Sequence, residues 1–149
     1  MNDCAICFSL GGTPVGKGRP RFVRSSGHAY TPDNTRNYES NLRRQAIMAM
    51  ELNYQKRLSG PVLLNVVAYC PIPKSWSNKK KVQASIGLLL PTTKPDVDNL
   101  LKIVGDALNG IIYDDDKQIT MASIRKEYSD DPRLAVFVSP IPVFSKQES

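Results

Sequence analysis

The sequence predicts an α+β domain in which a small mixed sheet carries helices packed mainly on one face. Segments with strand character occur at the start, the middle and the end of the chain, and helical patterns separate them. Residues 118–129 and 133–139 predict a final β-hairpin with the turn "DDP". The chain has no internal repeat or linker, so we expect a single domain over residues 1–149 with a loose tail from about residue 140.

The first elements follow from short local patterns. "AICFSL" (5–10) predicts a strand, and "HAYTP" (28–32) predicts a short strand that ends at a turn. Nothing breaks a helix from Asp33 to about Leu58, and apolar residues recur there at helical spacing. We therefore expect one long helix, which ends before Gly60-Pro61.

The middle of the chain predicts a buried strand and a short helix. "VLLNVVAYC" (62–70) is a continuous apolar run, which is typical of a strand buried on both faces. "SWSNKKKVQASIG" (75–87) predicts a short helix with Ser77 as its N-cap and Gly87 just beyond its end.

Basic residues outnumber acidic ones and are clustered. Twenty Lys and Arg against fourteen Asp and Glu give a net charge of +6. This excess suits a polyanionic partner, because neutralised phosphates release condensed counterions. Charge alone fits a merely basic protein equally well, but much of the acid is concentrated between Asp96 and Asp116. The clustered basic residues are Lys17, Arg19, Arg21, Arg24, Arg43, Arg44, Lys79, Lys80 and Lys81.

The composition also limits the class of protein. No apolar run approaches the roughly 18 residues that a membrane span needs, and the N-terminus lacks a signal-peptide pattern. We therefore expect an intracellular protein that does not bind membranes. No phosphate-binding G-x-x-x-x-G-K-[ST] loop or EF-hand pattern is present.

Cysteine and histidine give little support for zinc or nucleophilic chemistry. Cys4 and Cys7 have C-x-x-C spacing, but only Cys70 and His28 remain to complete four zinc ligands. In a strand, positions 4 and 7 also point to opposite faces. We expect buried free thiols, and His28 has no recognisable nucleophile motif to serve.

The segment "KPDVDNLLKIVGDALNGIIYDDDKQI" (94–119) carries the candidate chemistry. It predicts a helix from Asn99 to Asn109, with Asp98 as N-cap and Gly110 just after its end. Magnesium prefers carboxylates together with waters and phosphate oxygens. Two acids at the helix start and one from the run "DDD" could therefore converge on one ion or two and activate water at a phosphodiester. The apolar stripe of this helix contains Leu100, Val104, Ala107, Leu108 and Ile111. A separate polar stripe contains Asp98, Lys102, Asp106 and Asn109.

Each of these charged residues also has a structural interpretation. Asp98 could be only a helix cap, Asp96 a turn former and "DDD" a solvated loop. Lys102 could stabilise charge on a phosphorane-like transition state. It could instead pair with Asp98 or Asp106 as an i,i+4 ion pair, worth about 0.3–0.5 kcal/mol.

The same residues resemble a known family. "KPDVDNLLKIVGDALNG" followed by "YDDDKQI" closely resembles the central motif of RusA-type Holliday junction resolvases, also called crossover junction endodeoxyribonucleases. "GTPVGKGRPRFVR", "AYTPDNTRNYE" and "PIPKSWSNKKK" resemble the N-terminal and middle segments of its bacterial and phage members. The resemblance covers most of the chain, from Phe8 to Val138.

The resemblance implies a cytoplasmic, magnesium-dependent homodimer that makes paired nicks in four-way DNA junctions, with Mn²⁺ as an expected substitute metal. Asp96, Asp98 and Asp116 correspond to the metal-binding aspartates, Asp115 to an assisting acid, and Lys102 to the lysine needed for catalysis. The candidate DNA-binding residues are Lys17, Arg19, Arg21, Arg24, Lys79, Lys80 and Lys81.

Other interpretations stay open at this point. A solvated basic loop explains any single one of Arg19, Arg21 and Arg24 equally well. Trp76 is expected in the core or at an interface more often than stacked on a base. The alternative functions are a non-catalytic protein that binds branched DNA and a nuclease that acts on flaps or forks.

Overall fold

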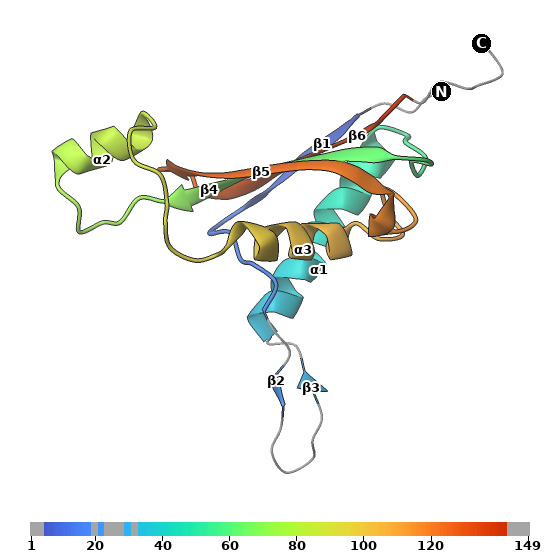
Figure 1. The fold of residues 1–149 in the computed structure, drawn as a ribbon, viewed down its shortest axis with the longest axis horizontal. Helices are drawn as coiled ribbons and strands as arrows, with labels where there is room; N and C mark the ends of the chain where they lie inside the picture. The colour runs from blue at the N-terminus through green and yellow to red at the C-terminus, as the bar shows by residue number, and fades with distance from the viewer. Residues whose placement is uncertain (1–4, 19–20, 23–28, 31–32, 143–149) are drawn as a thin grey trace.

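A mixed sheet forms the centre of the protein (Figure 1). It contains β1 (Ile6–Gly11), β4 (Val62–Pro71), β5 (Ile119–Ser129) and β6 (Arg133–Pro140), in the order β1-β6-β4-β5. Strand β6 is antiparallel to both β1 and β4, whereas β5 is parallel to β4. The predicted α+β class with a mixed sheet is therefore confirmed. The structure is a computed structural model that describes residues 5–18, 21–22, 29–30 and 33–142.

The predicted hairpin between the last two strands is wrong, because β5 and β6 both pair with β4 instead of with each other. Ile124 lies beside Val66 on one side of β4, and Val136 lies beside it on the other. Strand β4 takes this inner position because it is apolar on both faces, and the consecutive residues 66–68 are all buried. Strands two places apart are roughly 10 Å apart, and residues 130–132 connect them past the end of β4.

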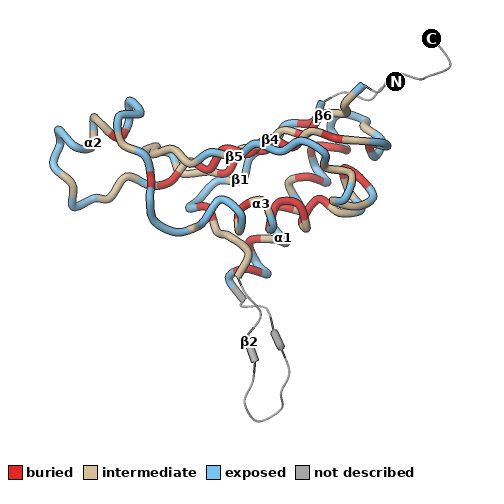
Figure 2. The backbone as a smooth tube through the Cα atoms, viewed as in Figure 1, coloured by how far each residue is buried: buried red, intermediate tan, exposed pale blue. Residues whose placement is uncertain are grey.

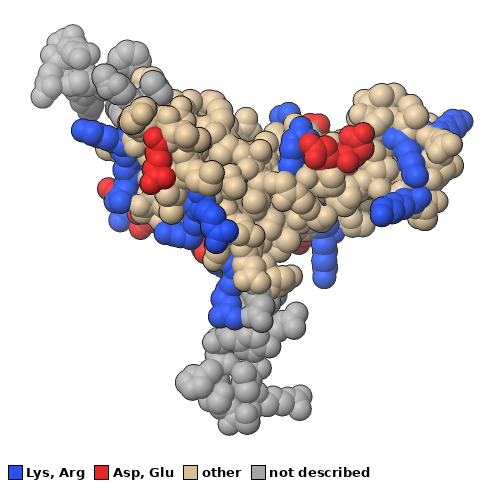
Figure 3. Space-filling model, turned by 180° about the vertical axis from the view of Figure 1, so that it is seen from behind, with Lys and Arg blue, Asp and Glu red and all other residues tan. Residues whose placement is uncertain are grey.

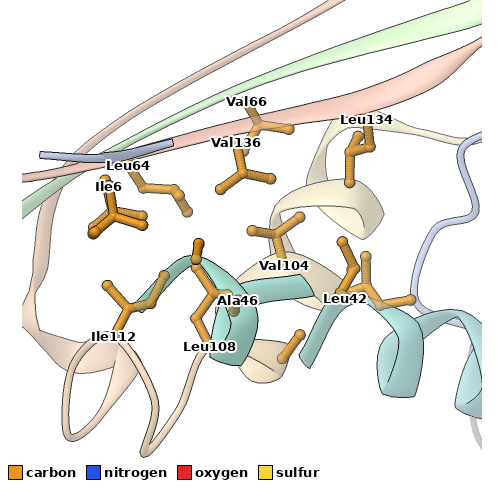
Figure 4. Packing of buried hydrophobic residues seen from close by; sticks show 14 of the residues in the cluster. Ile6, Leu42, Ala46, Leu64, Val66, Val104, Leu108, Ile112, Leu134 and Val136 are labelled. Atoms are coloured by element: carbon orange, nitrogen blue, oxygen red, sulfur yellow. The ribbon is translucent and has the colours of Figure 1, made fainter. Parts of the chain in front are cut away.

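Helices α1 (Asp33–Leu52) and α3 (Val97–Ala107) cover one face of the sheet, as predicted (Figure 1). Figure 4 shows the core between these helices and the sheet, which includes Leu42 of α1, Val104 of α3 and Val66 of β4. These three side chains are 0% exposed. The apolar stripe predicted for the second of these helices is buried at Leu100, Val104, Ala107 and Leu108 and half-buried at Ile111.

Helix α1 ends at Leu52, before the predicted end near Leu58. The chain leaves the helix through Tyr54, which has a positive φ of 50°. Leu58 is buried, and its N–H donates to the Ile112 carbonyl at 2.7 Å. Leu58 therefore packs against the segment that follows α3, and a continuous helix would not allow this contact.

Helix α2 (Asn78–Ser85) forms an arm that projects past one end of the sheet (Figure 1). Its predicted N-cap is confirmed, because the Ser77 hydroxyl accepts a hydrogen bond from the Lys80 N–H at 3.2 Å. Gly87, with a φ of +88°, follows the helix as predicted. Figure 2 shows that most of this arm is exposed. Among the described residues, no helix combines the length and apolar character that crossing a membrane requires.

A short antiparallel ribbon precedes α1. Strands β2 (Arg21–Phe22) and β3 (Ala29–Tyr30) form it, so the strand predicted near residues 28–32 is confirmed for Ala29–Tyr30. Arg19, Arg24 and His28 lie outside the described residues, and Arg21 is described only as part of the strand.

The expectation of buried thiols is correct for one cysteine and wrong for another. Cys70 is buried on the helix side of β4. Cys7 is exposed, because it alternates with Ile6 and Phe8 on β1 and faces the side of the sheet away from the helices. Cys4 lies outside the described residues.

Candidate functional site

Helix α3 begins earlier than predicted, and Asp96 is its N-cap instead of Asp98. Asp96 has extended backbone angles, and its carbonyl accepts the first helical hydrogen bond, from Leu100, at 3.0 Å. The Asp96 side chain makes no capping hydrogen bond. Asp98 lies in the first turn, where the helix dipole favours a carboxylate. Neither carboxylate is therefore used to cap the helix.

The far end of α3 is held by an arginine from α1. The helix ends at Ala107, so Gly110 does not follow it directly as predicted. The Arg43 guanidinium donates to the carbonyls of Ala107 at 2.9 Å and Asn109 at 3.2 Å. These carbonyls have no partner within the helix, so Arg43 satisfies them and fixes α3 against α1.

Three of the predicted site residues line one cleft between α3 and the sheet. Asp98 and Lys102 come from α3, and Asp116 comes from the loop that precedes β5. A Cβ added to Gly105 would lie 3.8 Å from the Asp116 Oδ2, so Asp116 lies directly against the helix. We call this the acidic cleft; its volume is about 320 Å³ and its lining is Leu64, Asp98, Leu101, Lys102, Gly105, Asp116, Ile119 and Ala122.

Asp96 lines a different cleft, beside the loop that follows β1. Gly16 brings this loop close to the start of α3, because a Cβ there would lie 2.9 Å from the Asn99 Cβ. The Lys17 N–H also donates to the Asn99 carbonyl at 2.9 Å. The structure thus brings Asp98, Lys102 and Asp116 together and does not bring Asp96 into the same cleft. No group of three Asp, Glu, His or Cys residues in the described ranges is arranged to hold a metal ion.

A short acidic loop carries Asp116 into the cleft. The 3₁₀ helix η1 (Asp116–Gln118) begins after Asp115, whose carboxylate accepts a hydrogen bond from the Lys117 N–H at 3.1 Å. Asp114 points outward and pairs with Arg57 at 2.9 Å. The run "DDD" therefore has three different roles: one surface ion pair, one helix cap and one cleft residue.

Asp115 and Asp116 interact closely. The side-chain hydrogen bond between their carboxyl groups raises the pKa of Asp116, to which desolvation also contributes, and lowers the pKa of Asp115. The neighbouring Asp115 carboxyl group and partial burial therefore disfavour the charged form of Asp116. A nearby cation would stabilise the charged forms of both carboxyl groups.

Lys102 belongs to an ion-pair network that is centred on Asp106. Its Nζ lies 3.3 Å from Asp106 Oδ1, and Lys17 Nζ lies 3.3 Å from Asp106 Oδ2. Lys17 also contacts Glu39 of α1 at 2.6 Å. Burial lowers the pKa of Lys17, but hydrogen bonds and charge from Glu39 and Asp106 outweigh this effect and raise its pKa overall. Lys17, predicted as a DNA contact, is thus engaged inside the protein.

The acidic cleft has a donor set that suits Mg²⁺. The ion takes one or two protein carboxylates and keeps waters or substrate phosphate oxygens in its other positions. Asp98 and Asp116 provide two carboxylates in one cleft, and both oxygens of Asp106 are already paired with lysines. Within the described chain, the two cleft acids are therefore the best placed to hold a divalent ion.

The α2 arm presents lysines at the protein surface, where Asp130 lines the same pocket as Lys81. Helix α2 has no acidic residue in its first turn and only one buried residue, Ala84. Lys80 lies 4.1 Å from the centroid of the Trp76 ring, and Trp76 packs edge-on against Tyr128 at 5.3 Å. Trp76 is thus half-buried against the body, in line with its expected structural role. In the rear view of Figure 3, Lys and Arg side chains lie at the end of the molecule that carries α2.

Sequence patterns missed three residues that support the site. Arg43 was recognised only as part of a basic cluster, and Asp106 only as a possible partner of Lys102. Gln118 was part of the motif, but its contacts across 58 to 60 residues of sequence are not visible in it. Local spacing gave Asp106 as one of two possible ion-pair partners of Lys102, and nothing local predicted the other contacts.

A small α+β protein with an acidic cleft, an adjacent lysine and a basic arm has the features expected of a DNA-cleaving protein. The family to which the chain belongs is that of the endodeoxyribonuclease RusA, whose family model matches residues 11–139. An uncharacterized protein of Bacillus subtilis (strain 168), YqaN, is 42% identical over 143 residues, which cover 93% of this chain and 98% of that protein. The chain is thus a member of a nuclease family, as its motifs predicted.

Proposed function

We propose that this protein is a magnesium-dependent endonuclease that resolves four-way DNA junctions by paired nicks, in recombination and repair in the cytoplasm of a bacterium or of a phage-infected cell. The observation that carries the proposal is the common cleft of Asp98, Lys102 and Asp116, three side chains from two separated segments. Membership in the RusA family supports the substrate. Mn²⁺ is the expected substitute metal.

The residues of the cleft have distinct roles in this proposal. Asp98 and Asp116 hold the metal, which supplies Lewis-acid polarisation of the phosphate and a more acidic bound water. Lys102, held by Asp106, places positive charge beside the phosphate oxygens as negative charge develops on them. Asp115 stabilises the loop and assists Asp116.

Asp96 is proposed as a third metal ligand. Its side chain caps no helix end and lies one residue before α3, so it is not committed to another role there. It lines the neighbouring cleft, so its participation requires that it turn toward Asp98 when DNA and metal are bound.

A homodimer would match the substrate. A four-way junction has approximate twofold symmetry, so two sites related by a dyad can cut two strands of like polarity at corresponding positions. Two chains of charge +6 each would also strengthen binding to the phosphate backbone. The α2 arms, with Lys79, Lys80 and Lys81, are proposed to contact the DNA arms.

The decisive experiment compares substrates and metals. The purified chain is mixed at physiological salt with a four-way junction, a fork, a flap and a linear duplex, first in EDTA and then with Mg²⁺ or Mn²⁺. We expect paired nicks in the junction only when the metal is present. Asp98→Asn, prepared in the same way, controls for contaminating nucleases, and Glu51→Gln, at an exposed site on α1, controls for the loss of one charge.

The other outcomes have clear meanings. Junction binding without nicks under any metal condition would contradict the proposal and favour a non-catalytic protein that binds branched DNA. Equal cutting of forks or flaps would favour a nuclease of broader structural specificity. Nicking in EDTA would contradict the role of the metal.

A further inference from the structure

Gln118 has an unusually complete set of hydrogen bonds for a side chain at the protein surface. Its Oε1 accepts from the backbone N–H groups of Asp114 at 2.8 Å and Asp115 at 3.2 Å. Its Nε2 donates to the carbonyls of Leu58 at 3.2 Å and Gly60 at 2.9 Å. A glutamine amide has two donor hydrogens and two acceptor lone pairs, and all four are used here.

These bonds connect two segments that are far apart in the sequence. One is the acidic loop that carries Asp115 and Asp116, and the other is the turn of residues 58–60 that leads into β4. The turn is itself anchored, because Leu58 is buried and bonded to Ile112. Gln118 therefore ties the acidic loop to a fixed part of the fold.

The position of Asp116 depends on this loop. Gln118 fixes the two backbone N–H groups that precede Asp116, while the Asp115 carboxylate accepts from the Lys117 N–H on its other side. The other end of the loop is held by Tyr113, whose hydroxyl donates to the Gly105 carbonyl of α3 at 2.9 Å. With both ends held, the Asp116 carboxylate is placed against α3 in the acidic cleft.

Few other residues could make the same contacts. Glutamate has a similar size and keeps the acceptors, but it has no N–H groups for the carbonyls of Leu58 and Gly60. Methionine fills a similar volume and lacks strong hydrogen-bonding groups. Asparagine is one methylene shorter and would not reach both segments from the same backbone position.

We propose that Gln118 is a positioning residue that holds Asp116 in the acidic cleft and thereby sets the affinity of the cleft for a divalent metal. The inference rests on the proposed function, because it assumes that Asp98 and Asp116 bind the metal. Residues that orient metal ligands from outside the coordination shell typically change metal affinity about 10- to 100-fold when they are mutated. Gln118→Met should therefore weaken metal binding by about tenfold or more.

Metal binding to the DNA-free protein tests the inference without relying on cleavage. Mn²⁺ affinity is measured by electron paramagnetic resonance for the wild type, Gln118→Met, Gln118→Glu and Gln55→Met, with the Tm of each. Gln55, whose side chain donates one hydrogen bond to the carbonyl of the next residue, Lys56, is the matched control and should leave Mn²⁺ affinity unchanged. Gln118→Glu should weaken binding, although its added negative charge alone would strengthen it.

A second comparison separates positioning from general stability. In an Asp116→Asn background, Gln118→Met should cause no further loss of Mn²⁺ affinity, because the ligand that it positions is already lost. The inference is contradicted if Gln118→Met lowers the Tm without weakening Mn²⁺ binding, or if it weakens binding equally with and without Asp116.

The remaining outcomes are also informative. If Gln118→Met does not fold, Gln118→Glu decides by the direction of its effect, since tighter binding would overturn the inference. Absence of Mn²⁺ binding by the wild type would overturn the proposed function together with this inference. Wild-type binding that none of the Gln118 variants alters would overturn the inference alone.

Discussion

The acidic cleft and the α2 arm use charge in opposite ways. In the cleft region, charged side chains interact with one another: Lys102 forms an ion pair with Asp106, and the Asp115 carboxyl group raises the pKa of Asp116. On the arm, Lys79 and Lys81 make no ion pair with any described residue, and Lys80 lies over the Trp76 ring. Internal pairing fixes a side chain in place, whereas an unpaired surface lysine is free to neutralise a phosphate.

In the proposed function, chemistry and DNA binding therefore reside in separate parts of the molecule. The arm and the cleft follow one another in sequence between β4 and β5, but α2 packs against β5 and not against α3. Variants in the cleft should therefore change cleavage with little effect on binding. Variants in the arm should change binding with little effect on the chemical step.

The largest expected effect comes from the cleft acids. Asp98→Asn or Asp116→Asn should reduce the single-turnover cleavage rate by more than about 10³-fold, because metal activation of water and charge stabilisation are both lost. Binding to a four-way junction in EDTA should be unchanged or tighter, since one negative charge is removed. Cleavage by either variant at the wild-type rate would contradict the site.

Removing the cleft lysine should have the next largest effect. Lys102→Ala should slow cleavage by about 10²–10³-fold, the usual cost of losing one group that stabilises transition-state charge. Junction affinity, measured by fluorescence anisotropy, should change only modestly. An equal loss of binding and cleavage would instead indicate that Lys102 acts mainly as a phosphate contact.

A smaller effect on cleavage is expected from Asp106, which forms an ion pair with Lys102. Asp106→Asn should reduce cleavage about tenfold to 100-fold, because small misplacements of a catalytic group are costly and this residue holds Lys102 at 3.3 Å. In a Lys102→Ala background the same change should cause no further loss. Additive effects of the two substitutions would show that Asp106 does not act through Lys102.

Substitutions in the α2 arm should change the salt dependence of DNA binding and leave the metal-dependent cleavage step unchanged. Replacing Lys79, Lys80 and Lys81 with alanine should reduce the dependence of log K on log salt by about 2.7 for each α2 arm that contacts DNA, if each lysine neutralises one phosphate at about 0.9 per contact. Cleavage at saturating protein should stay unchanged. An unchanged salt dependence would show that these lysines do not contact DNA phosphates.

The smallest expected effect is a change in thermal stability on substitution of Gly105, which lines the acidic cleft. A Cβ at Gly105 would meet Asp116 atoms at 3.7–3.8 Å, which is ordinary contact. Gly105→Ala should therefore stabilise α3 by about 0.5–1 kcal/mol and raise the Tm by roughly 2–4 °C. A lower Tm in calorimetry would show that the cleft needs more room at this point than the contact distances suggest.

Local patterns were sufficient to predict most elements of the fold. Ser77 and Gly87 bound the arm helix as predicted, because capping depends on adjacent residues. The β5–β6 hairpin was wrong, because strand order depends on β4, more than fifty residues earlier in the sequence. A turn signal such as "DDP" cannot distinguish a hairpin from a link across an intervening strand.

The sequence identified which residues form the candidate site, but it did not predict how all of them are arranged in space. The motif identified Asp98, Lys102 and Asp116, and these residues share a cleft. The motif did not indicate that Asp96 lines a neighbouring cleft or that Lys17 pairs with Glu39 and Asp106. Those facts depend on how the loop after β1 packs against α3, and the spacing of residues within one segment carries no information about that packing.

The parallel pairing of β4 with β5 has a consequence for how such proteins vary. Parallel neighbours cannot be joined by a tight turn, so the chain must return along the sheet through a long crossover. Both the arm and the segment that carries the acidic cleft lie within this one crossover connection, one after the other. In the proposed function, insertions or deletions in the arm would therefore alter how far the protein reaches along DNA, while the strands beside the acidic cleft keep their register.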